Sequence, residues 1–158
     1  MIYSLRNADW HLKMDSNAIS TLSGFQQTGM FSREKMGQLF STNLLSEEIS
    51  IKLVTNIKPV RSSRTEVKFD PSEIQKEREE LFEQGLHCVG LWHTHPEPIP
   101  TPSGLDEALA KDYALAAQQD LKGIVFAIVG TAPFPFGLAM WVHDGKTLHK
   151  AYYQDSLI

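Results

Sequence analysis

The chain has 158 residues, is 42% hydrophobic and carries a net charge of −4. This length and apolar content suit one compact domain, which we expect to span residues 1–158. The negative charge argues against nucleic acid as a partner, because nucleic-acid binders depend on clustered Lys and Arg. The sequence has neither a secretory signal nor a run of roughly 18 apolar residues that could span a membrane, so no membrane partner is expected. The lone Cys88 cannot form an internal disulfide, which fits a soluble protein in the reducing cytoplasm.

Short β-branched or aromatic runs alternate with longer segments of helical spacing along the chain, a pattern typical of the α/β class. We therefore expect a mixed central sheet flanked by helices. In the first half, Asp15 or Ser16 caps a helix that Gly29 ends. The elements expected there are a strand at 10–14, a helix to about Thr28, strands at 36–43 and 49–54, a polar loop at 58–64 and a strand at 65–69.

In the second half, Asp70-Pro71 is a strong helix start, because the acid can cap a helix whose first position is proline. That helix should run to Gln84. A strand at 86–94 is apolar on both faces and should lie in the centre of the sheet. After a proline-rich loop, a helix at 103–119 is expected to turn these residues toward the core: Leu105, Ala108, Leu109, Ala116 and Ala117. Strands at 124–129, 137–142 and 147–152 follow, the last two joined by an Asp144-Gly145 hairpin turn.

Four residues at the end of the central strand and the start of the next helix could form a metal site. His93 and His95 are two positions apart on a strand, so both imidazoles project from the same face and can share one ion. Ser103 and Asp106 lie within one helical turn of each other and can reach back toward the strand end. Two neutral imidazoles and one carboxylate are suitable ligands for one catalytic Zn²⁺ ion, with a fourth position left for water.

The stretch from His93-Thr94-His95-Pro96 to Ser103-Gly104-Leu105-Asp106 resembles the metal motif of the JAMM zinc metallopeptidases, also called MPN+ or JAB-domain proteins. In that family a glutamate precedes a glycine-rich strand, commonly as Glu-x-Gly-Gly. The segment Glu34-Lys35-Met36-Gly37 is similar and keeps the second glycine. The resemblance implies the single-domain JAB/MPN fold, which is related to the cytidine deaminase fold.

The resemblance also implies roles for these residues. His93, His95 and Asp106 would bind zinc, Glu34 would be the general base and then the general acid, and Ser103 would donate a hydrogen bond to the oxyanion. The family cleaves isopeptide or peptide bonds that follow the C-terminal tail of ubiquitin-like proteins. Small stand-alone members resemble the deconjugating peptidases of bacterial antiviral operons, including the cyclic-oligonucleotide signalling type known as CBASS.

Several alternatives remain open. The enzyme could trim the C-terminus of a sulfur-carrier protein, or the chain could be a metal-free MPN scaffold. Ser103 and Asp106 could merely cap a helix, and Glu47 and Glu48 are other upstream acids. Deamination is excluded, because the later Pro-Cys-x-x-Cys of zinc deaminases is missing. DNA-repair proteins with a similar His-x-His motif are a distant possibility, because this chain has no room for their DNA-binding module.

Overall fold

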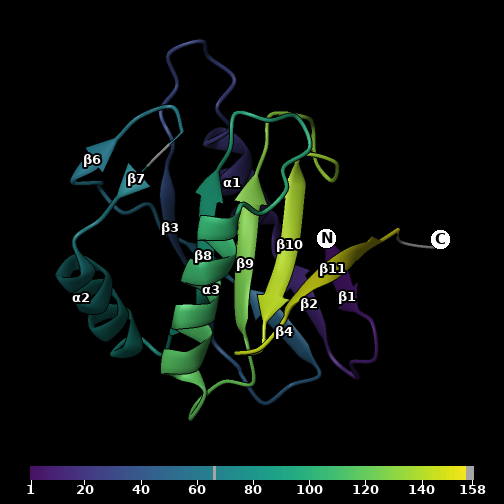
Figure 1. Ribbon diagram of the computed structural model, residues 1–158. Helices are drawn as coiled ribbons and strands as arrows, with labels where there is room; N and C mark the ends of the chain where they lie inside the picture. The colour runs from purple at the N-terminus through teal and green to yellow at the C-terminus, as the bar shows by residue number, and fades with distance from the viewer. Residues whose placement is uncertain (66, 156–158) are drawn as a thin grey trace.

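The computed structural model describes residues 1–65 and 67–155, which form a large mixed sheet, a small hairpin and three helices (Figure 1). The large sheet has the strand order β4-β2-β1-β11-β10-β9-β8-β3-β5. Its strands are β1 (Ile2–Leu5), β2 (His11–Met14), β3 (Met36–Ser41), β4 (Glu48–Ile51), β5 (Leu53–Val54), β8 (His87–Thr94), β9 (Ile124–Val129), β10 (Leu138–His143) and β11 (Leu148–Gln154). Strands β6 (Arg61–Ser62) and β7 (Val67–Lys68) pair only with each other.

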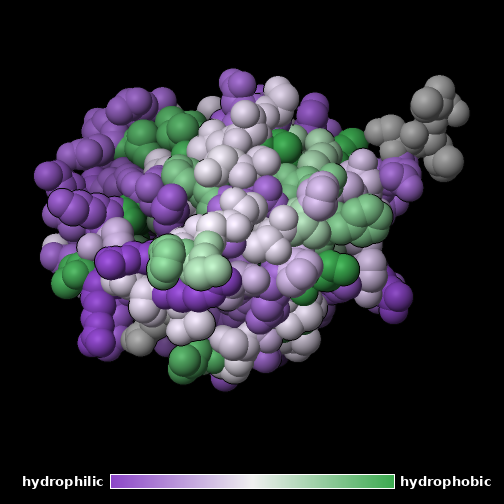
Figure 2. All heavy atoms as spheres, turned by 90° about the horizontal axis from the view of Figure 1, so that it is seen from above, coloured by the Kyte–Doolittle hydropathy of each residue, from purple (hydrophilic) through white to green (hydrophobic). Residues whose placement is uncertain are grey.

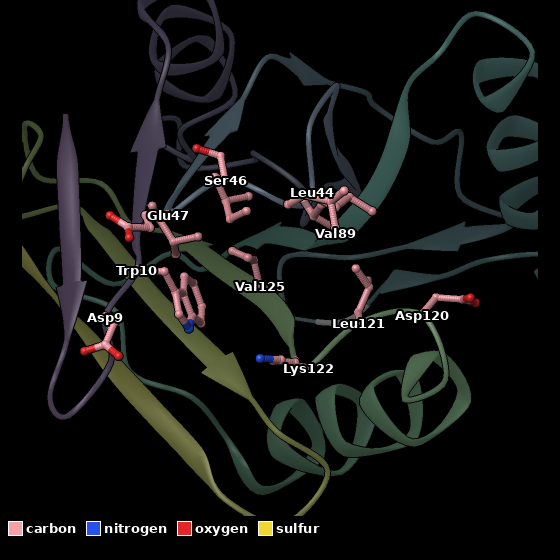
Figure 3. A pocket seen from close by; sticks show the side chains of 14 residues that line it. Asp9, Trp10, Leu44, Ser46, Glu47, Val89, Asp120, Leu121, Lys122 and Val125 are labelled. Carbon is pink, nitrogen blue, oxygen red and sulfur yellow. The ribbon is translucent and has the colours of Figure 1, made fainter.

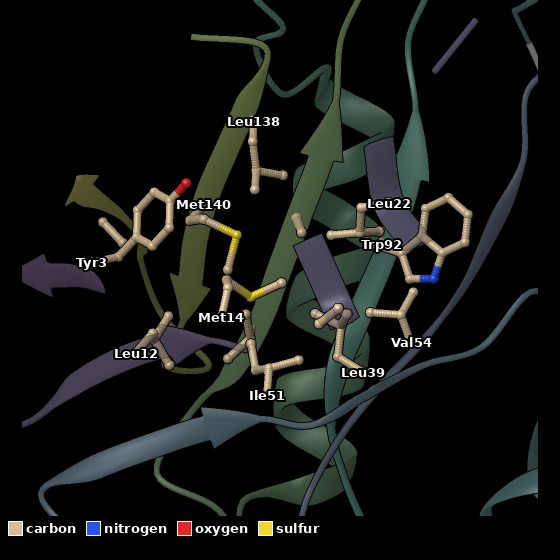
Figure 4. Packing of buried hydrophobic residues seen from close by; sticks show 14 of the residues in the cluster. Tyr3, Leu12, Met14, Leu22, Leu39, Ile51, Val54, Trp92, Leu138 and Met140 are labelled. Carbon is tan, nitrogen blue, oxygen red and sulfur yellow. The ribbon is translucent and has the colours of Figure 1, made fainter. Parts of the chain in front are cut away.

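The helices cover both faces of this sheet, as the sequence predicts. Helix α1 (Ser16–Gly24) packs on one face, while α2 (Pro71–Phe82) and α3 (Gly104–Ala117) lie on the other (Figure 1). The larger core lies on the α1 side, where Leu22 and Trp92 pack among the buried side chains that Figure 4 shows. A smaller core lies under α3 and includes Phe126 and Ile128. The predicted α/β class with a flanked mixed sheet is confirmed.

Several elements lie close to their predicted positions. Asp70 caps α2 by accepting a hydrogen bond from the Ser72 N–H at 2.9 Å. The turn at Asp144 and Gly145 joins β10 to β11, and Gly145 has a φ of 95°, a conformation that glycine adopts without strain. None of the helices in the described residues is long and apolar enough to cross a membrane.

Three boundaries near the first half of the chain were predicted wrongly. Helix α1 ends at Gly24 rather than at Thr28, because the side chains of Gln26 and Gln27 form hydrogen bonds with carbonyls of distant segments. The expected strand at 49–54 is two strands: β4 pairs with β2, and β5 pairs with β3. The expected loop at 58–64 contains β6, whose partner β7 occupies only part of the expected strand at 65–69. Residue 66 lies outside the described residues.

The face of α3 that packs on the sheet also differs from the prediction. The buried residues are Ala110 and Ala114, whereas Leu105 is 84% exposed and Leu109 is 37% exposed. Alanines let the helix approach the sheet closely, and they lie four and eight residues after Asp106, on the same side of the helix. The side of α3 that carries Asp106 toward the sheet is therefore the side that is buried.

Candidate metal centre

The two motif histidines come together where β8 ends. His93 is buried, and its Nε2 lies 2.7 Å from Nε2 of His95. Their rings meet edge to face, with centroids 4.6 Å apart, and the His93 ring also packs against Phe126 at 5.1 Å. Because residues two apart on a strand share a face, both imidazoles project toward the α3 side of the sheet. The structure therefore brings this predicted pair together.

Asp106 completes the same cluster from the first turn of α3. Its Oδ1 lies 3.2 Å from Nε2 of His93, and its Oδ2 lies 3.3 Å from Nε2 of His95. The carboxylate also caps its own helix, because Oδ2 accepts a hydrogen bond from the Ser103 N–H at 2.7 Å. The Asp106 N–H in turn donates to Oγ of Ser103 at 3.1 Å. The helix cap and the contact with both histidines thus coexist in one side chain.

Glu34 approaches the histidines from the segment before β3. It is 7% exposed, and its Oε1 lies 4.0 Å from Nε2 of His93. Ligand atoms of Glu34, His93 and His95 all lie within 4.8 Å of one another, so these three residues are placed to bind a metal ion. At Nε2 of His93, the Asp106 oxygen at 3.2 Å is nearer than the Glu34 oxygen at 4.0 Å. Two carboxylates therefore flank the histidine pair at different distances.

Burial and charge act in opposite directions on the protonation of this cluster. Burial lowers the pKa of His93, only partly offset by its hydrogen bond to Asp106. Burial also opposes charge on His95, but the hydrogen bond and charge of Asp106, with Glu34 and Glu97, raise its pKa overall. Burial disfavours the Asp106 anion, yet hydrogen bonds from both histidines hold its pKa well below the usual range. The balance provides a carboxylate beside a neutral imidazole.

These residues fit a metal ion such as zinc. Their donor set of two imidazole nitrogens and carboxylate oxygens is the chemistry of catalytic zinc sites. Both Nε2 atoms turn toward each other and toward Asp106, a convergence that suits a shared cation. Nδ1 of His95 is buried without a hydrogen-bond partner among the described residues, and Oε1 of Glu97 lies 3.9 Å from it. A small approach of Glu97 would supply the partner that zinc-binding histidines usually have.

The incomplete glycine motif after Glu34 has a packing reason. A Cβ at Gly37 would lie 1.8 Å from the carbonyl oxygen of Thr55 and 2.7 Å from Nε1 of Trp92. The position thus has no space for a side chain. Met36, which stands at the first glycine position of the family pattern, instead packs into the core under α3 and is 4% exposed. The sequence keeps the glycine that the fold requires.

The alternative acids lie elsewhere. Glu48 pairs with His11 at 3.1 Å and with Lys13 at 3.4 Å on β2, and Glu47 lines a pocket at the other end of the sheet. Ser103 is exposed, and its hydroxyl oxygen accepts the cap hydrogen bond. Its own proton thus stays available for donation. Of Glu34, Glu47 and Glu48, Glu34 is the one placed beside the histidines.

Two buried polar residues at this end were not foreseen from the sequence. Gln27 is 2% exposed and Thr94 is fully buried, and the Thr94 hydroxyl donates to Oε1 of Gln27 at 2.8 Å. Thr94 lies between the two histidines, so its burial could have been inferred from its neighbours. A glutamine at the end of an amphipathic segment gives no such signal.

A cavity of about 410 Å³ lies at the opposite end of the sheet, near the starts of β8 and β9 (Figure 3). Its floor is apolar and includes Trp10, Val89 and Val125, while Asp9 and Asp120 lie among its polar lining residues. The face above the histidines, seen in Figure 2, carries hydrophobic residues in separate groups. Hydrophilic residues gather there on the side of α2 and the β6–β7 hairpin.

The fold and the histidine cluster define a JAB-type domain, and the comparisons with known proteins agree. The family described as prokaryotic homologs of the JAB domain matches residues 26–143. The chain therefore belongs to this family, as the metal motif predicts. No curated protein matches the chain.

Two proteins with solution structures share the fold. One, from Desulfitobacterium hafniense, has a TM-score of 0.67 and 14% identity, and the match covers 89% of this chain and 90% of that one. Another, from Salinibacter ruber, has a TM-score of 0.57 and 19% identity over 92% of this chain and 93% of that one. At this identity the likeness concerns the fold alone.

Proposed function

We propose that this protein is a zinc-dependent peptidase that cleaves the bond after the C-terminal tail of a ubiquitin-like protein. The observation that carries the proposal is the convergence of His93, His95 and Asp106, with Glu34 beside them. Membership of the JAB family supports it, because many members of that family are metallopeptidases. The scaffold alternative is less favoured, because a scaffold has no need of this ligand set.

His93, His95 and Asp106 would hold one zinc ion, since Asp106 oxygens lie 3.2 Å from Nε2 of His93 and 3.3 Å from Nε2 of His95, whereas Oε1 of Glu34 lies 4.0 Å from Nε2 of His93. When bound, zinc supplies Lewis acidity, which polarises a carbonyl group and lowers the pKa of water to about 7. Glu34 lies further from His93 than Asp106 does, at a distance where a carboxylate can accept a proton without being a metal ligand. The two acids thus take different roles because of their different distances.

The reaction is hydrolysis of an amide. The Glu34 carboxylate accepts a proton from the attacking water, whose oxygen bonds to the carbonyl carbon. Ser103 Oγ–H donates to the carbonyl oxygen as negative charge develops there, a contribution of about 3 to 4 kcal/mol in comparable sites. The C–N bond then breaks, and Glu34 delivers its proton to the leaving nitrogen. The products are a carboxylate at the end of the tail and a free amine.

The substrate class follows from the family resemblance. A flexible tail can pair in extended form with a strand edge, which would hold it straight across the site. We propose that the cleaved bond joins a ubiquitin-like tail to a target, and that the reaction serves a bacterial antiviral defence system. Trimming of a sulfur-carrier protein is the alternative, and a panel that compares tail peptides with isopeptide conjugates separates the two.

The test is cleavage of a ubiquitin-like fusion by the zinc-loaded wild type and by Glu34→Gln. We expect cleavage by the wild type and a fall of about 10²- to 10⁴-fold in the variant, the usual worth of a general base. The zinc content should stay unchanged. Glu48→Gln, an acid on the far strand β4, serves as the matched control and should cleave normally. Equal rates for wild type and Glu34→Gln would remove Glu34 from the mechanism, and an inactive, zinc-loaded wild type would overturn the proposed function.

A further inference from the structure

The segment that carries Glu34 is fixed by hydrogen bonds at every backbone polar group of two residues. The Glu34 N–H donates to the Ser63 carbonyl at 2.6 Å, and Oγ of Ser62 donates to the Glu34 carbonyl at 2.6 Å. The Lys35 N–H donates to Oγ1 of Thr94 at 2.9 Å, and the Thr94 N–H donates to the Lys35 carbonyl at 2.9 Å. The direction of the Glu34 side chain is thus set by two anchors, the β6–β7 hairpin and Thr94.

One side chain connects these two anchors. Oε1 of Gln27 accepts from the Thr94 hydroxyl at 2.8 Å, while Nε2 donates to the Arg64 carbonyl at 3.1 Å and to the Ser32 carbonyl at 3.2 Å. The acceptor and donor partners fix the orientation of the amide. Because Gln27 and Thr94 are buried, water cannot replace these hydrogen bonds without a rearrangement.

We propose that Gln27 is a positioning residue that holds Glu34 at its working distance from the histidines by joining Thr94 to the hairpin. The inference rests on the proposed function, in which Glu34 is the general base. The hydrogen bonds of Gln27 described above do not involve His93, His95 or Asp106; we infer that it acts through Thr94, Arg64 and the backbone of Glu34 and Lys35. Loss of Gln27 should therefore lower the rate of the chemical step and leave the binding of zinc and substrate unchanged.

The neighbouring Gln26 offers a matched control. Its Nε2 donates to the carbonyls of Gly130 and Ala132 at 2.8 Å each, so it also anchors a loop through two hydrogen bonds. Those bonds hold the β9–β10 loop and do not contact the Glu34 segment. Replacing either glutamine by methionine keeps the length of the side chain and removes its hydrogen bonds. A general loss of stability would affect both variants, whereas loss of positioning would affect only Gln27→Met.

The experiment compares kcat and KM of zinc-loaded wild type, Gln27→Met, Gln26→Met, Thr94→Val and Thr94→Ser on the ubiquitin-like fusion. Misplacement of a reacting group by about 1 Å can cost about 100-fold in rate. We expect kcat to fall by about 10- to 100-fold in Gln27→Met and Thr94→Val, with KM and zinc content unchanged. Thr94→Ser, which keeps the hydroxyl, and Gln26→Met should keep the wild-type kcat.

A second readout is independent of activity. Hydrogen exchange at the backbone amides of Glu34 and Lys35 should accelerate in Gln27→Met and Thr94→Val, and should stay slow in Thr94→Ser and Gln26→Met. Unchanged exchange in Gln27→Met, loss of zinc from it, or equal loss of kcat in both glutamine variants would overturn the inference. If the wild type does not cleave, the proposed function fails, and the exchange rates alone decide whether Gln27 fixes the Glu34 segment.

Discussion

The two ends of the central sheet differ in the side chains that lie there. At the end where β8 finishes, side chains from three segments of the chain converge, and His93 and Asp106 approach to 3.2 Å. At the other end lies a cavity of about 410 Å³, with an apolar floor and carboxylates around it (Figure 3). Among the described residues, only the first end holds a cluster of metal-binding side chains. Convergent polar groups, and not cavity size, mark the candidate site.

The polar residues of the two ends also differ in their partners. Asp106 is held by both histidines and by the Ser103 N–H, and these contacts keep its pKa low against the effect of burial. Asp120, at the cavity end, forms no ion pair among those found in the described residues. Replacing a carboxylate by an amide should therefore have very different effects on zinc affinity at the two ends.

The largest effect is expected from Asp106→Asn. The amide keeps the shape and an oxygen that can cap α3, but it removes the negative charge that faces both histidines. We expect zinc affinity to fall by at least about 100-fold, since even loss of an outer partner costs 10- to 100-fold. Zinc titration with a competing chelator measures this change.

Asp120→Asn is the matched exchange at the cavity end and should leave zinc affinity and cleavage unaltered. Equal losses of zinc affinity in the two variants would contradict the contrast between the ends of the sheet. Unaltered zinc affinity in Asp106→Asn would instead point to Glu34 as the carboxylate ligand.

A smaller effect, on stability, is expected from Gly37→Ala in β3. The new methyl group would meet the Thr55 carbonyl oxygen at 1.8 Å, so the backbone must shift. We expect a loss of about 1 to 3 kcal/mol in the free energy of unfolding. In a domain of this size each kcal/mol lowers Tm by about 2 to 4 °C. Gly24→Ala, with nothing within 4 Å of the new methyl group, should unfold at or above the wild-type temperature.

The fold was largely predictable because apolar periodicity and turn residues are local signals. Residues inside or next to the element predict the bounds of β9, the Asp70 cap of α2 and the Asp144-Gly145 turn. The split between β4 and β5 could not be predicted in this way, because it depends on which distant strand each segment pairs with.

The site was predictable where chemistry and spacing act together. The spacing of His93, His95 and Asp106 indicated their convergence, which the distances bear out, while their roles as ligands remain predictions. The same spacing also predicts the buried face of α3: if Asp106 faces the sheet, Ala110, four residues later, faces it too, and Leu109 does not. Gln27 could not be identified because its three partners, at residues 32, 64 and 94, are brought together only by the fold.

The smallest expected effect is on the pH dependence of stability, and it concerns the turn at Asp144 near the cavity end. Hydrogen bonds from the Thr147 N–H, the His149 ring and the Lys146 N–H hold the pKa of Asp144 below its usual range. A lowered pKa in the folded state adds stability above the unfolded value of about 4, and this contribution is lost as the pH falls below it. Thermal unfolding between about pH 5 and pH 2 should therefore show a shallower loss of stability in Asp144→Ala than in the wild type. Parallel curves for the two proteins would show that the turn makes no such contribution.

The central claim is that His93, His95 and Asp106 bind zinc while Glu34 stays beside it as the base. A crystal structure of the zinc-loaded protein, with the metal located by anomalous scattering at the zinc edge, tests this claim most directly. We expect one zinc ion at about 2.0 to 2.2 Å from Nε2 of both histidines and from an Asp106 oxygen. The Glu34 carboxylate should lie outside bonding distance of the ion. Zinc bound through Glu34 in place of Asp106, or located away from the histidines, would contradict the account.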